Sequence, residues 1–219
     1  MSPPPQREVV HGDALAWMAE RPAMPGVSVI CSIPDVSELG TTMPLWEAWF
    51  IEAARLALRV TPPDGVTVFF HTDLKHEGRW ISKAALVLRA ADRPLLWHKV
   101  VCRKPAGDVS RGRPGFSNLL AFSESVRDDA NRPFPDVLPS LGEMAWSHSM
   151  GSAAASLAAG FVRRMSPATH TIVAPFCGLG AALDAANRVG LAAIGIERNR
   201  KRAERARVVK LEPAPPTAV

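Results

Sequence analysis

Short apolar runs alternate with amphipathic segments along most of the chain. The apolar runs predict strands at residues 8–11, 27–31, 66–70, 95–102, 119–122, 171–173 and 194–197. Apolar residues at helical spacing predict a helix at residues 44–59. Further helices are predicted at residues 14–20 and 80–91, at the small-residue segment 153–164 and at the basic segment 198–210. Strands that alternate with helices predict an α/β fold, in which a central, mostly parallel sheet carries helices on both faces.

The chain has 219 residues, enough for one domain with a full hydrophobic core, which we expect over residues 7–211. Within it, residues 124–150 are irregular and partly Pro-rich, and they predict a loop. The Pro-rich ends, residues 1–6 and 212–219, are expected to be disordered tails. No apolar run approaches the roughly 20 residues that cross a bilayer, and the first residues lack the apolar core of a secretory signal. We therefore expect no membrane association.

The net charge is +5 and the isoelectric point is about 9.6. This balance is compatible with a polyanionic partner, and equally with an Arg-rich proteome in which many proteins are mildly basic. The cysteines, Cys31, Cys102 and Cys177, form no CxxC pair. They argue against a disulfide framework and a zinc site and fit a reducing cytoplasm, so no metal is expected.

The segment Ala174-Pro175-Phe176-Cys177-Gly178-Leu179-Gly180 joins a predicted strand to an alanine-rich helix, and the next predicted strand ends at Glu197. In such a unit the glycines let the backbone approach a ligand, and the acid accepts hydrogen bonds from ribose hydroxyls. The segment therefore indicates a site for an adenosine-containing cofactor. Two earlier strands end in Gly12-Asp13 and in Ser32-Ile33-Pro34-Asp35, at the edge of the sheet where α/β proteins bind ligands.

Taken in chain order, these motifs resemble those of the DNA amino-methyltransferases that methylate adenine N6 or cytosine N4. The likeness is to their circularly permuted, beta-type arrangement, in which the catalytic half precedes the cofactor half. The matching segments are Gly12-Asp13, Ser32-Ile33-Pro34-Asp35, Trp97-His98-Lys99, Leu119-Leu120-Ala121-Phe122-Ser123, Pro175-Phe176-Cys177-Gly178-Leu179-Gly180 and Gly195-Ile196-Glu197. The resemblance spans most of the chain and implies a Rossmann-like methyltransferase domain, with its catalytic half at residues 7–123 and its cofactor half at residues 151–211.

The resemblance also implies roles for particular residues. S-adenosylmethionine would bind the glycine loop, with Glu197 on the ribose and Asp13 near the adenine amino group. The loop residues concerned are Pro175, Phe176, Cys177, Gly178 and Gly180. In the catalytic tetrapeptide Ser32-Ile33-Pro34-Asp35, the Ser32 hydroxyl and the Ile33 carbonyl would hold the two N–H groups of an exocyclic amine on the target base. Its lone pair would then point at the sulfonium methyl, and proximity and orientation would supply most of the rate without a metal.

Several positions depart from the family pattern. Ala174 and Ala181 stand where the family has an acid and a threonine, and Met150-Gly151 replaces its Lys-Pro pair. In the tetrapeptide, Ile33 replaces a proline and Asp35 replaces the aromatic that stacks on a flipped base. Two interpretations stay open. In the first, Asp35 accepts hydrogen bonds from the N1–H and N2 amino edge of guanine or helps to remove a proton. In the second, the active site is degenerate and the fold is retained for binding.

The basic residues Arg103, Lys104, Arg111 and Arg113 lie between two predicted strands, where they either contact nucleic-acid phosphates or form a solvated loop. The resemblance favours DNA as substrate. Since only about 25 residues separate Ser123 from His148, where such enzymes carry a target-recognition insert, RNA or a specificity partner stays open. A homodimer, a non-enzymatic binding module and a small-molecule methyltransferase are further alternatives.

Four other side chains have two interpretations each. His71 and Asp73 end a predicted strand and form either a strand-end pair or part of the substrate site. Trp46 and Trp49, at helical spacing, are expected in the core or on a helix face rather than as stacking platforms.

Overall fold

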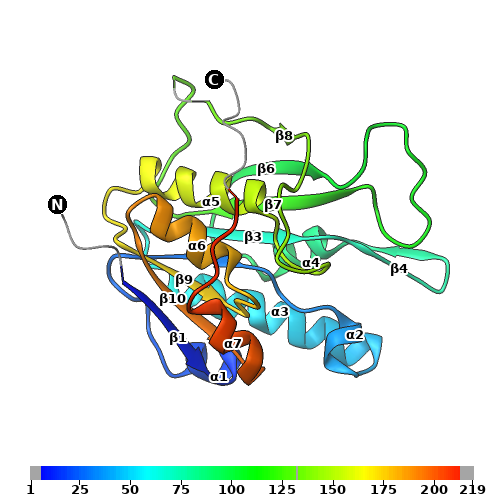
Figure 1. The fold of residues 1–219 in the computed structure, drawn as a ribbon, viewed down its shortest axis with the longest axis horizontal. Coiled ribbons are helices and arrows are strands. Elements are labelled where there is room, and N and C mark those ends of the chain that lie inside the picture. The colour runs from blue at the N-terminus through cyan, green and yellow to red at the C-terminus, as the bar shows by residue number, and fades with distance from the viewer. Residues whose placement is uncertain (1–5, 132, 213–219) are drawn as a thin grey trace.

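A computed structural model describes residues 6–131 and 133–212 of the chain (Figure 1). Its main sheet has eight strands in the order β1-β10-β9-β2-β3-β7-β6-β8. These are β1 (Arg7–His11), β2 (Val27–Cys31), β3 (Thr67–His71), β6 (Leu95–Cys102), β7 (Phe116–Phe122), β8 (Val137–Leu138), β9 (Thr171–Pro175) and β10 (Ala192–Glu197). Only β7 runs antiparallel to its neighbours within this sheet of described residues. The α/β class and the mostly parallel sheet are therefore confirmed.

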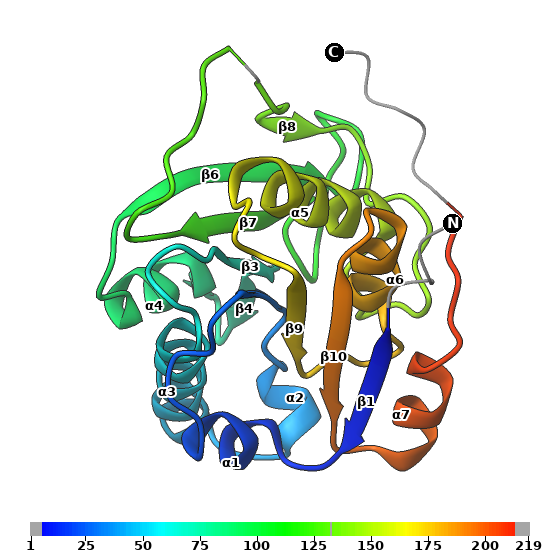
Figure 2. The ribbon, with the colours of Figure 1, turned by 90° about the vertical axis from the view of Figure 1, so that its left-hand side faces the viewer.

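Helices cover both faces of the sheet (Figures 1 and 2). One face carries α1 (Ala14–Ala19), α3 (Met43–Val60) and α4 (Lys83–Ala90), and the other carries α5 (Ser152–Met165), α6 (Ala181–Arg188) and α7 (Arg200–Ala206). Each face has its own core, with Trp46 and Phe50 buried in the first and Phe161 and Leu183 in the second. Because β2, β3 and β9 are buried on both faces, they read as continuous apolar runs. No helix in the described ranges is both long and apolar enough to cross a membrane.

The segment before α4 differs from its sequence-based prediction. Residues 80–91 predict one helix, whereas α4 begins only at Lys83. The preceding residues form a two-stranded hairpin, β4 (Leu74–His76) and β5 (Arg79–Ile81). The chain reverses at Glu77 and Gly78, which both have positive φ (48° and 74°), as a tight two-residue hairpin turn requires. Glutamate is not a typical residue for that conformation, so the turn leaves little trace in the sequence.

Most other elements lie within a few residues of their predicted positions. The last helix is shorter than residues 198–210 predict: it ends at Ala206, and Asn199 caps its start by accepting a hydrogen bond from the Arg202 N–H (3.1 Å). The short helix α2 (Val36–Leu39) and strand β8 are not apparent from the sequence pattern. The tails expected at residues 1–6 and 212–219 lie outside the described residues, apart from Gln6 and Glu212.

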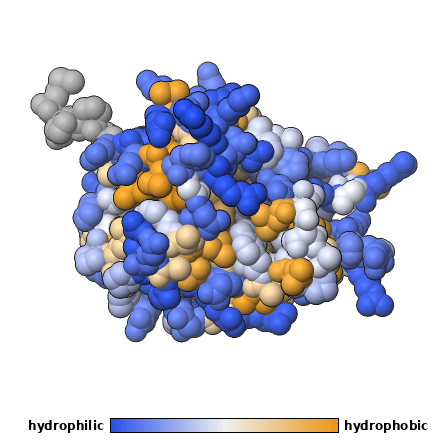
Figure 3. Space-filling model, turned by 90° about the horizontal axis from the view of Figure 1, so that it is seen from below, coloured by the Kyte–Doolittle hydropathy of each residue, from blue (hydrophilic) through white to orange (hydrophobic). Residues whose placement is uncertain are grey.

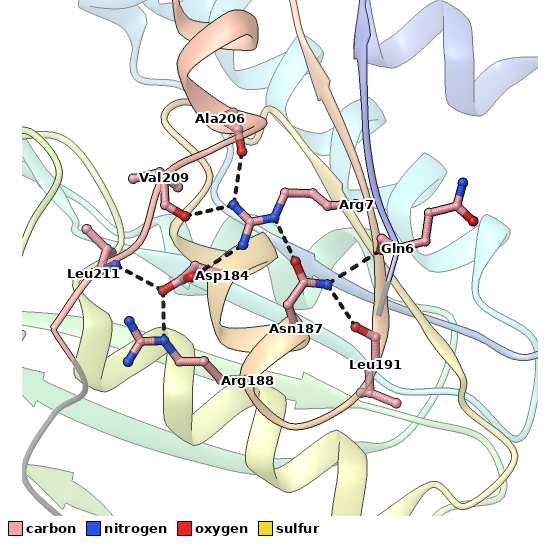
Figure 4. A network of polar contacts seen from close by, with 9 residues as sticks. All are labelled: Gln6, Arg7, Asp184, Asn187, Arg188, Leu191, Ala206, Val209 and Leu211. Carbon is pink, nitrogen blue, oxygen red and sulfur yellow. Dashed lines mark hydrogen bonds and ion pairs between the residues drawn. The ribbon is translucent and has the colours of Figure 1, made fainter. Parts of the chain in front are cut away.

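A buried polar network joins the first strand to the last part of the chain (Figure 4). The Arg7 guanidinium lies 3.3 Å from the Asp184 carboxylate and donates to the Val209 carbonyl (2.8 Å). Asp184 also pairs with Arg188 (2.8 Å) and accepts from the Leu211 N–H (3.0 Å). These contacts fasten β1, α6 and the segment after α7 to one another, although they are distant in sequence.

Candidate active site

The carboxyl ends of β9 and β2 meet near the middle of the sheet. The two strands pair in parallel, with Val29 opposite Val173. After β9 the chain enters α6 on one face, and after β2 it continues through α2 into α3 on the opposite face. Such a change of direction leaves a crevice that binds ligands in open α/β sheets. Figure 3 views this end of the molecule, where apolar patches are interrupted by hydrophilic ones.

A cavity of about 380 Å³ opens at this position, a size suited to a small-molecule ligand. Most of the sequence-predicted site residues line it: Asp13, Ser32, Ile33, Pro34, Asp35, Arg103, Arg113, Pro175, Phe176, Cys177, Gly178 and Glu197. Gly180, Lys104 and Arg111 do not. The cavity thus brings together the three strand ends whose residues indicated a ligand site in the sequence.

The glycine loop is held in shape by Glu197. The Glu197 carboxylate accepts hydrogen bonds from the N–H groups of Gly178 (3.0 Å) and Asn199 (2.7 Å). Gly178 has φ 57°, and a Cβ there would lie 3.7 Å from the Trp146 indole nitrogen. Gly180 has φ 89° and begins α6, where a Cβ would lie 3.0 Å from the Ala206 carbonyl, so its role is to let α6 and α7 approach. Because each carboxylate oxygen accepts more than one hydrogen bond, Glu197 can also receive ribose hydroxyls, and the residues present fit an adenosine-containing cofactor.

The Cys177 thiol packs against β10, although the residue also lines the cavity. A Cβ on Gly195 would lie 2.7 Å from its sulfur, which shows how closely the thiol packs on that strand. Burial, and then the charge of Glu197, raise the pKa of Cys177 to about 12. The thiol therefore stays protonated at neutral pH and acts as a small packing group, not as a nucleophile.

Asp13 and Ser32 reach the cavity from the first two strand ends. Asp13 caps α1 by accepting a hydrogen bond from the Ala16 N–H (2.9 Å). The Ser32 hydroxyl has no hydrogen-bond partner within the part of the chain that the structure describes. In contrast, the Pro34 carbonyl accepts a hydrogen bond from the Trp46 indole N–H (3.0 Å), which holds the tetrapeptide against α3. A free hydroxyl on a fixed backbone is suited to receive an amine N–H.

Asp35 is buried and paired with two cations. Its carboxylate contacts the ammonium of Lys83, and its second oxygen lies 2.6 Å from the Arg113 guanidinium. Burial, and then the charge of Arg113, lower the pKa of Lys83 to about 7. The ion pairs draw α4 and the loop between β6 and β7 onto the tetrapeptide. Sequence reasoning missed Lys83, because nothing in the pattern of α4 indicates that its first residue is buried beside Asp35.

Aromatic side chains line the cavity on two sides, although position 35 carries none. Trp49 and Phe176 meet edge to face, with ring centroids 5.5 Å apart. Trp146 stacks on His148 (4.9 Å), and the Arg202 guanidinium lies 4.1 Å from the Trp146 ring centroid. The last three residues belong to segments interpreted from the sequence only as an irregular loop and a basic helix.

The strand end after β3 contributes a histidine and an aspartate with different environments. His71 lines the cavity, and neither of its ring nitrogens has a hydrogen-bond partner among the described residues. Burial, and then the charge of His98, lower the pKa of His71 to about 3, so its ring is neutral. Asp73 instead accepts hydrogen bonds from the Lys83 N–H (2.8 Å) and the Trp80 indole N–H (3.0 Å). The two residues therefore do not form the strand-end pair that was one expectation.

Three potential metal ligands also gather at the cavity. Ligand atoms of Asp35, Glu38 and His148 lie within 4.8 Å of one another. Both oxygens of the Asp35 carboxylate already contact cationic side chains, so a metal ion would compete with Lys83 and Arg113 for this ligand.

No protein-family model and no curated protein matches the sequence. Solved structures do match the fold. A putative DNA modification methylase from Thermus thermophilus matches with a TM-score of 0.68 and 18% identity, over 92% of each chain. The same protein has a structure in complex with S-adenosyl-L-methionine, which matches with a TM-score of 0.66.

Two further solved structures match the fold. The PvuII DNA methyltransferase, described as cytosine-N4-specific, matches with a TM-score of 0.69 and 15% identity, over 96% of this chain and 91% of that one. The M1.HpyAVI–SAM complex matches with a TM-score of 0.60 and 14% identity, over 92% of this chain and 98% of that one. The chain therefore has the α/β fold of these DNA methyltransferase structures.

Proposed function

We propose that the protein is an S-adenosylmethionine-dependent methyltransferase that acts on an exocyclic amine of a nucleobase in nucleic acid, with DNA favoured over RNA. One observation carries the proposal: the glycine loop with Glu197 and the tetrapeptide from Ser32 to Asp35 line one cavity at the switch point of the sheet. The fold matches to a putative DNA modification methylase and to a DNA methyltransferase, and to two structures solved with S-adenosylmethionine, support it.

On the cofactor side, Gly178 and Glu197 would hold the adenosine part, with Asp13 at the rim of the cavity. The stacked pair of Trp146 and His148 would cover it, because Trp146 lies over Gly178. When bound, the cofactor supplies an electrophilic sulfonium methyl group.

On the substrate side, the Ser32 hydroxyl would accept a hydrogen bond from the amine, and the Ile33 carbonyl would accept the second. The Trp46 contact to Pro34 supports this role, because it fixes the backbone that presents both groups. Held in this way, the amine keeps its lone pair directed toward the cofactor half of the cavity, and orientation supplies most of the rate.

We propose further that the order of the two halves is circularly permuted. The catalytic half, residues 7–123, would precede the cofactor half, residues 151–211. The sheet order supports this, because β9, which leads into the glycine loop late in the chain, pairs in parallel with β2, which leads into the tetrapeptide early in the chain.

Isothermal titration with S-adenosylmethionine tests the cofactor part. We expect binding that Glu197→Ala weakens at least about tenfold, because the loop loses two N–H contacts, each worth about 1.5 kcal/mol or more with a charged acceptor. Glu204→Ala, on exposed α7 surface, is the matched control. Absence of binding at millimolar cofactor would overturn the enzyme assignment. The alternative would then be a nucleic-acid- or partner-binding module, which is also compatible with the ion pairs on Asp35.

Transfer of a labelled methyl group to total DNA or total RNA tests the substrate part. Ser32→Ala is expected to lower the rate by about 100-fold with unchanged cofactor affinity, since a misplaced amine loses its orientation. If the protein binds the cofactor but transfers label to neither DNA nor RNA, the proposal of a nucleic-acid substrate is contradicted.

A further inference from the structure

The hairpin β4–β5 and the loop between β6 and β7 lie side by side and project from one end of the molecule (Figure 1, right). The Lys75 ammonium of the hairpin donates to the Ser110 carbonyl of the loop (3.5 Å). The rings of Trp80 and Phe116 lie 6.4 Å apart across the base of the two segments. We call the surface formed by Lys75, Arg79, Trp80, Lys104, Arg111 and Phe116 the hairpin ridge.

Two aromatic rings on the hairpin ridge face solvent. Trp80 is 49% exposed and Phe116 is 36% exposed, which is unusual for residues of this size. Trp80 is also fixed, because its indole N–H donates to the buried Asp73 (3.0 Å) while the Lys75 ammonium lies 5.7 Å from its ring. An exposed ring whose polar atom is anchored from below is an ordered platform for stacking.

The hairpin ridge is also cationic. It carries Lys75, Arg79, Lys104 and Arg111, against the acids Glu77 and Asp108 in the same two segments, residues 74–81 and 103–116. Figure 3 shows a mostly hydrophilic surface where these segments project. Cations that follow a phosphate backbone, interleaved with aromatic rings that accept unpaired bases, are the features with which proteins bind single-stranded nucleic acid.

A short chain of contacts connects the hairpin ridge to the candidate active site. Asp73, which anchors Trp80, accepts a hydrogen bond from the Lys83 N–H (2.8 Å). The Lys83 ammonium in turn contacts Asp35 in the tetrapeptide, and the guanidinium of Arg113, from the β6–β7 loop, pairs with the same carboxylate. Because Arg103 and Arg113 of the same loop line the cavity, a nucleic-acid segment lying on the ridge is next to it.

We propose that the hairpin ridge binds a single-stranded segment of nucleic acid and delivers a neighbouring unpaired nucleotide to the cavity. The proposal rests on the proposed function and narrows its substrate to unpaired nucleic acid. In a duplex the faces of the bases stack on one another and are not available to Trp80 or Phe116. Single-stranded DNA and RNA share the bases and phosphates that these side chains contact, so the experiment separates them.

Fluorescence anisotropy tests the proposal with the full chain, in the absence of cofactor. The probes are labelled DNA and RNA strands of about 12 nucleotides with one sequence, and the corresponding duplexes. We expect at least one strand to bind about tenfold or more tightly than its duplex. Trp80→Ala and Phe116→Ala are each expected to weaken that binding by about 5- to 100-fold, and Trp80→Phe to restore most of it.

Two control variants accompany these measurements. Leu88→Ala and Arg89→Ala lie on the exposed side of α4 and should leave strand affinity unchanged. Equal affinity for strand and duplex, or full strand affinity in both Trp80→Ala and Phe116→Ala, would overturn the proposal. Because the assay contains no cofactor, a protein that fails to bind S-adenosylmethionine can still show the expected binding to single strands. If instead the protein methylates duplex nucleic acid and Trp80→Ala does not change that activity, the hairpin-ridge proposal is wrong and the proposed function stands.

Discussion

Asp184 and Asp35 are both buried and both pair with two cations, but their partners differ in what else they contact. Beside Asp184, the Arg7 guanidinium is saturated with further acceptors, which are Asn187 Oδ1 (2.7 Å) and the carbonyls of Ala206 (3.3 Å) and Val209 (2.8 Å) (Figure 4). Beside Asp35, the charged groups of Lys83 and Arg113 have no other hydrogen-bond acceptor in the described part of the chain. Both of these residues line the cavity.

The difference teaches what each cluster does. In the closed network all three guanidinium nitrogens of Arg7 donate within the protein, which holds the ends of the chain together. An open cluster leaves N–H donors facing a cavity, where a substrate with acceptor atoms can use them. The same ion-pair chemistry thus serves stability in one region and ligand recognition in the other.

The largest expected effect is loss of stability at the closed network. Asp184→Ala leaves the largely buried Arg7 without its counter-charge, and we expect it to lower the free energy of unfolding by about 3–5 kcal/mol in urea denaturation. Glu204→Ala breaks the exposed pair with Arg200 and should cost less than about 1 kcal/mol. Similar losses in the two variants would show that the network around Asp184 does not stabilise the fold.

A smaller stability loss, with a larger effect on methyl transfer, is expected at Asp35. Asp35→Ala should cost about 1–3 kcal/mol of stability, because Lys83 can release its proton and Arg113 reaches solvent. Its kcat/KM should fall at least about tenfold through misplacement of the tetrapeptide, with cofactor affinity retained. If activity survives intact while Ser32→Ala abolishes it, Asp35 takes no part in the reaction and the guanine-edge hypothesis is wrong.

The smallest expected effect is a pH dependence that distinguishes the open cluster. The pKa of Lys83 is about 7 in the folded chain and about 10.5 in the unfolded chain. Between these values the unfolded chain binds more protons, so the contribution of Lys83 makes stability rise with pH. Cys31 and Cys177 act in the opposite direction above about pH 9, because burial raises the pKa of both thiols above the ordinary value of 9.0.

The measurement is therefore the difference between wild type and Lys83→Met in urea midpoint from pH 7 to 9. We expect the wild type to gain stability relative to the variant over this interval. Parallel profiles would mean that Lys83 keeps its proton throughout, as a permanent partner of Asp35.

Much of the fold was predictable because its signals are local. Continuous apolar runs mark β2, β3 and β9, since these strands are buried on both faces. The hairpin β4–β5 was not predictable for two reasons. Glu77 has a positive φ although glutamate is not a typical residue for that conformation, and the segment that begins at Trp80 has the pattern of an amphipathic helix.

The candidate site divides in the same way. Asp13, Ser32 and Glu197 stand at strand ends, and the α/β pattern places strand ends at one edge of the sheet. The proximity of Lys83 and Arg113 to Asp35 depends on how α4 and the β6–β7 loop pack, which no neighbouring residue in the sequence indicates.

The sequence by itself therefore determined most of the strands and helices, the α/β class and which strand ends carry reactive groups, because periodicity and turn residues act over a few positions. Only the tertiary structure decided which cations neutralise Asp35 and Asp184, and that Trp80 stays exposed beside Phe116. Those outcomes depend on burial and charge between segments far apart in the chain, and a linear pattern carries no record of them.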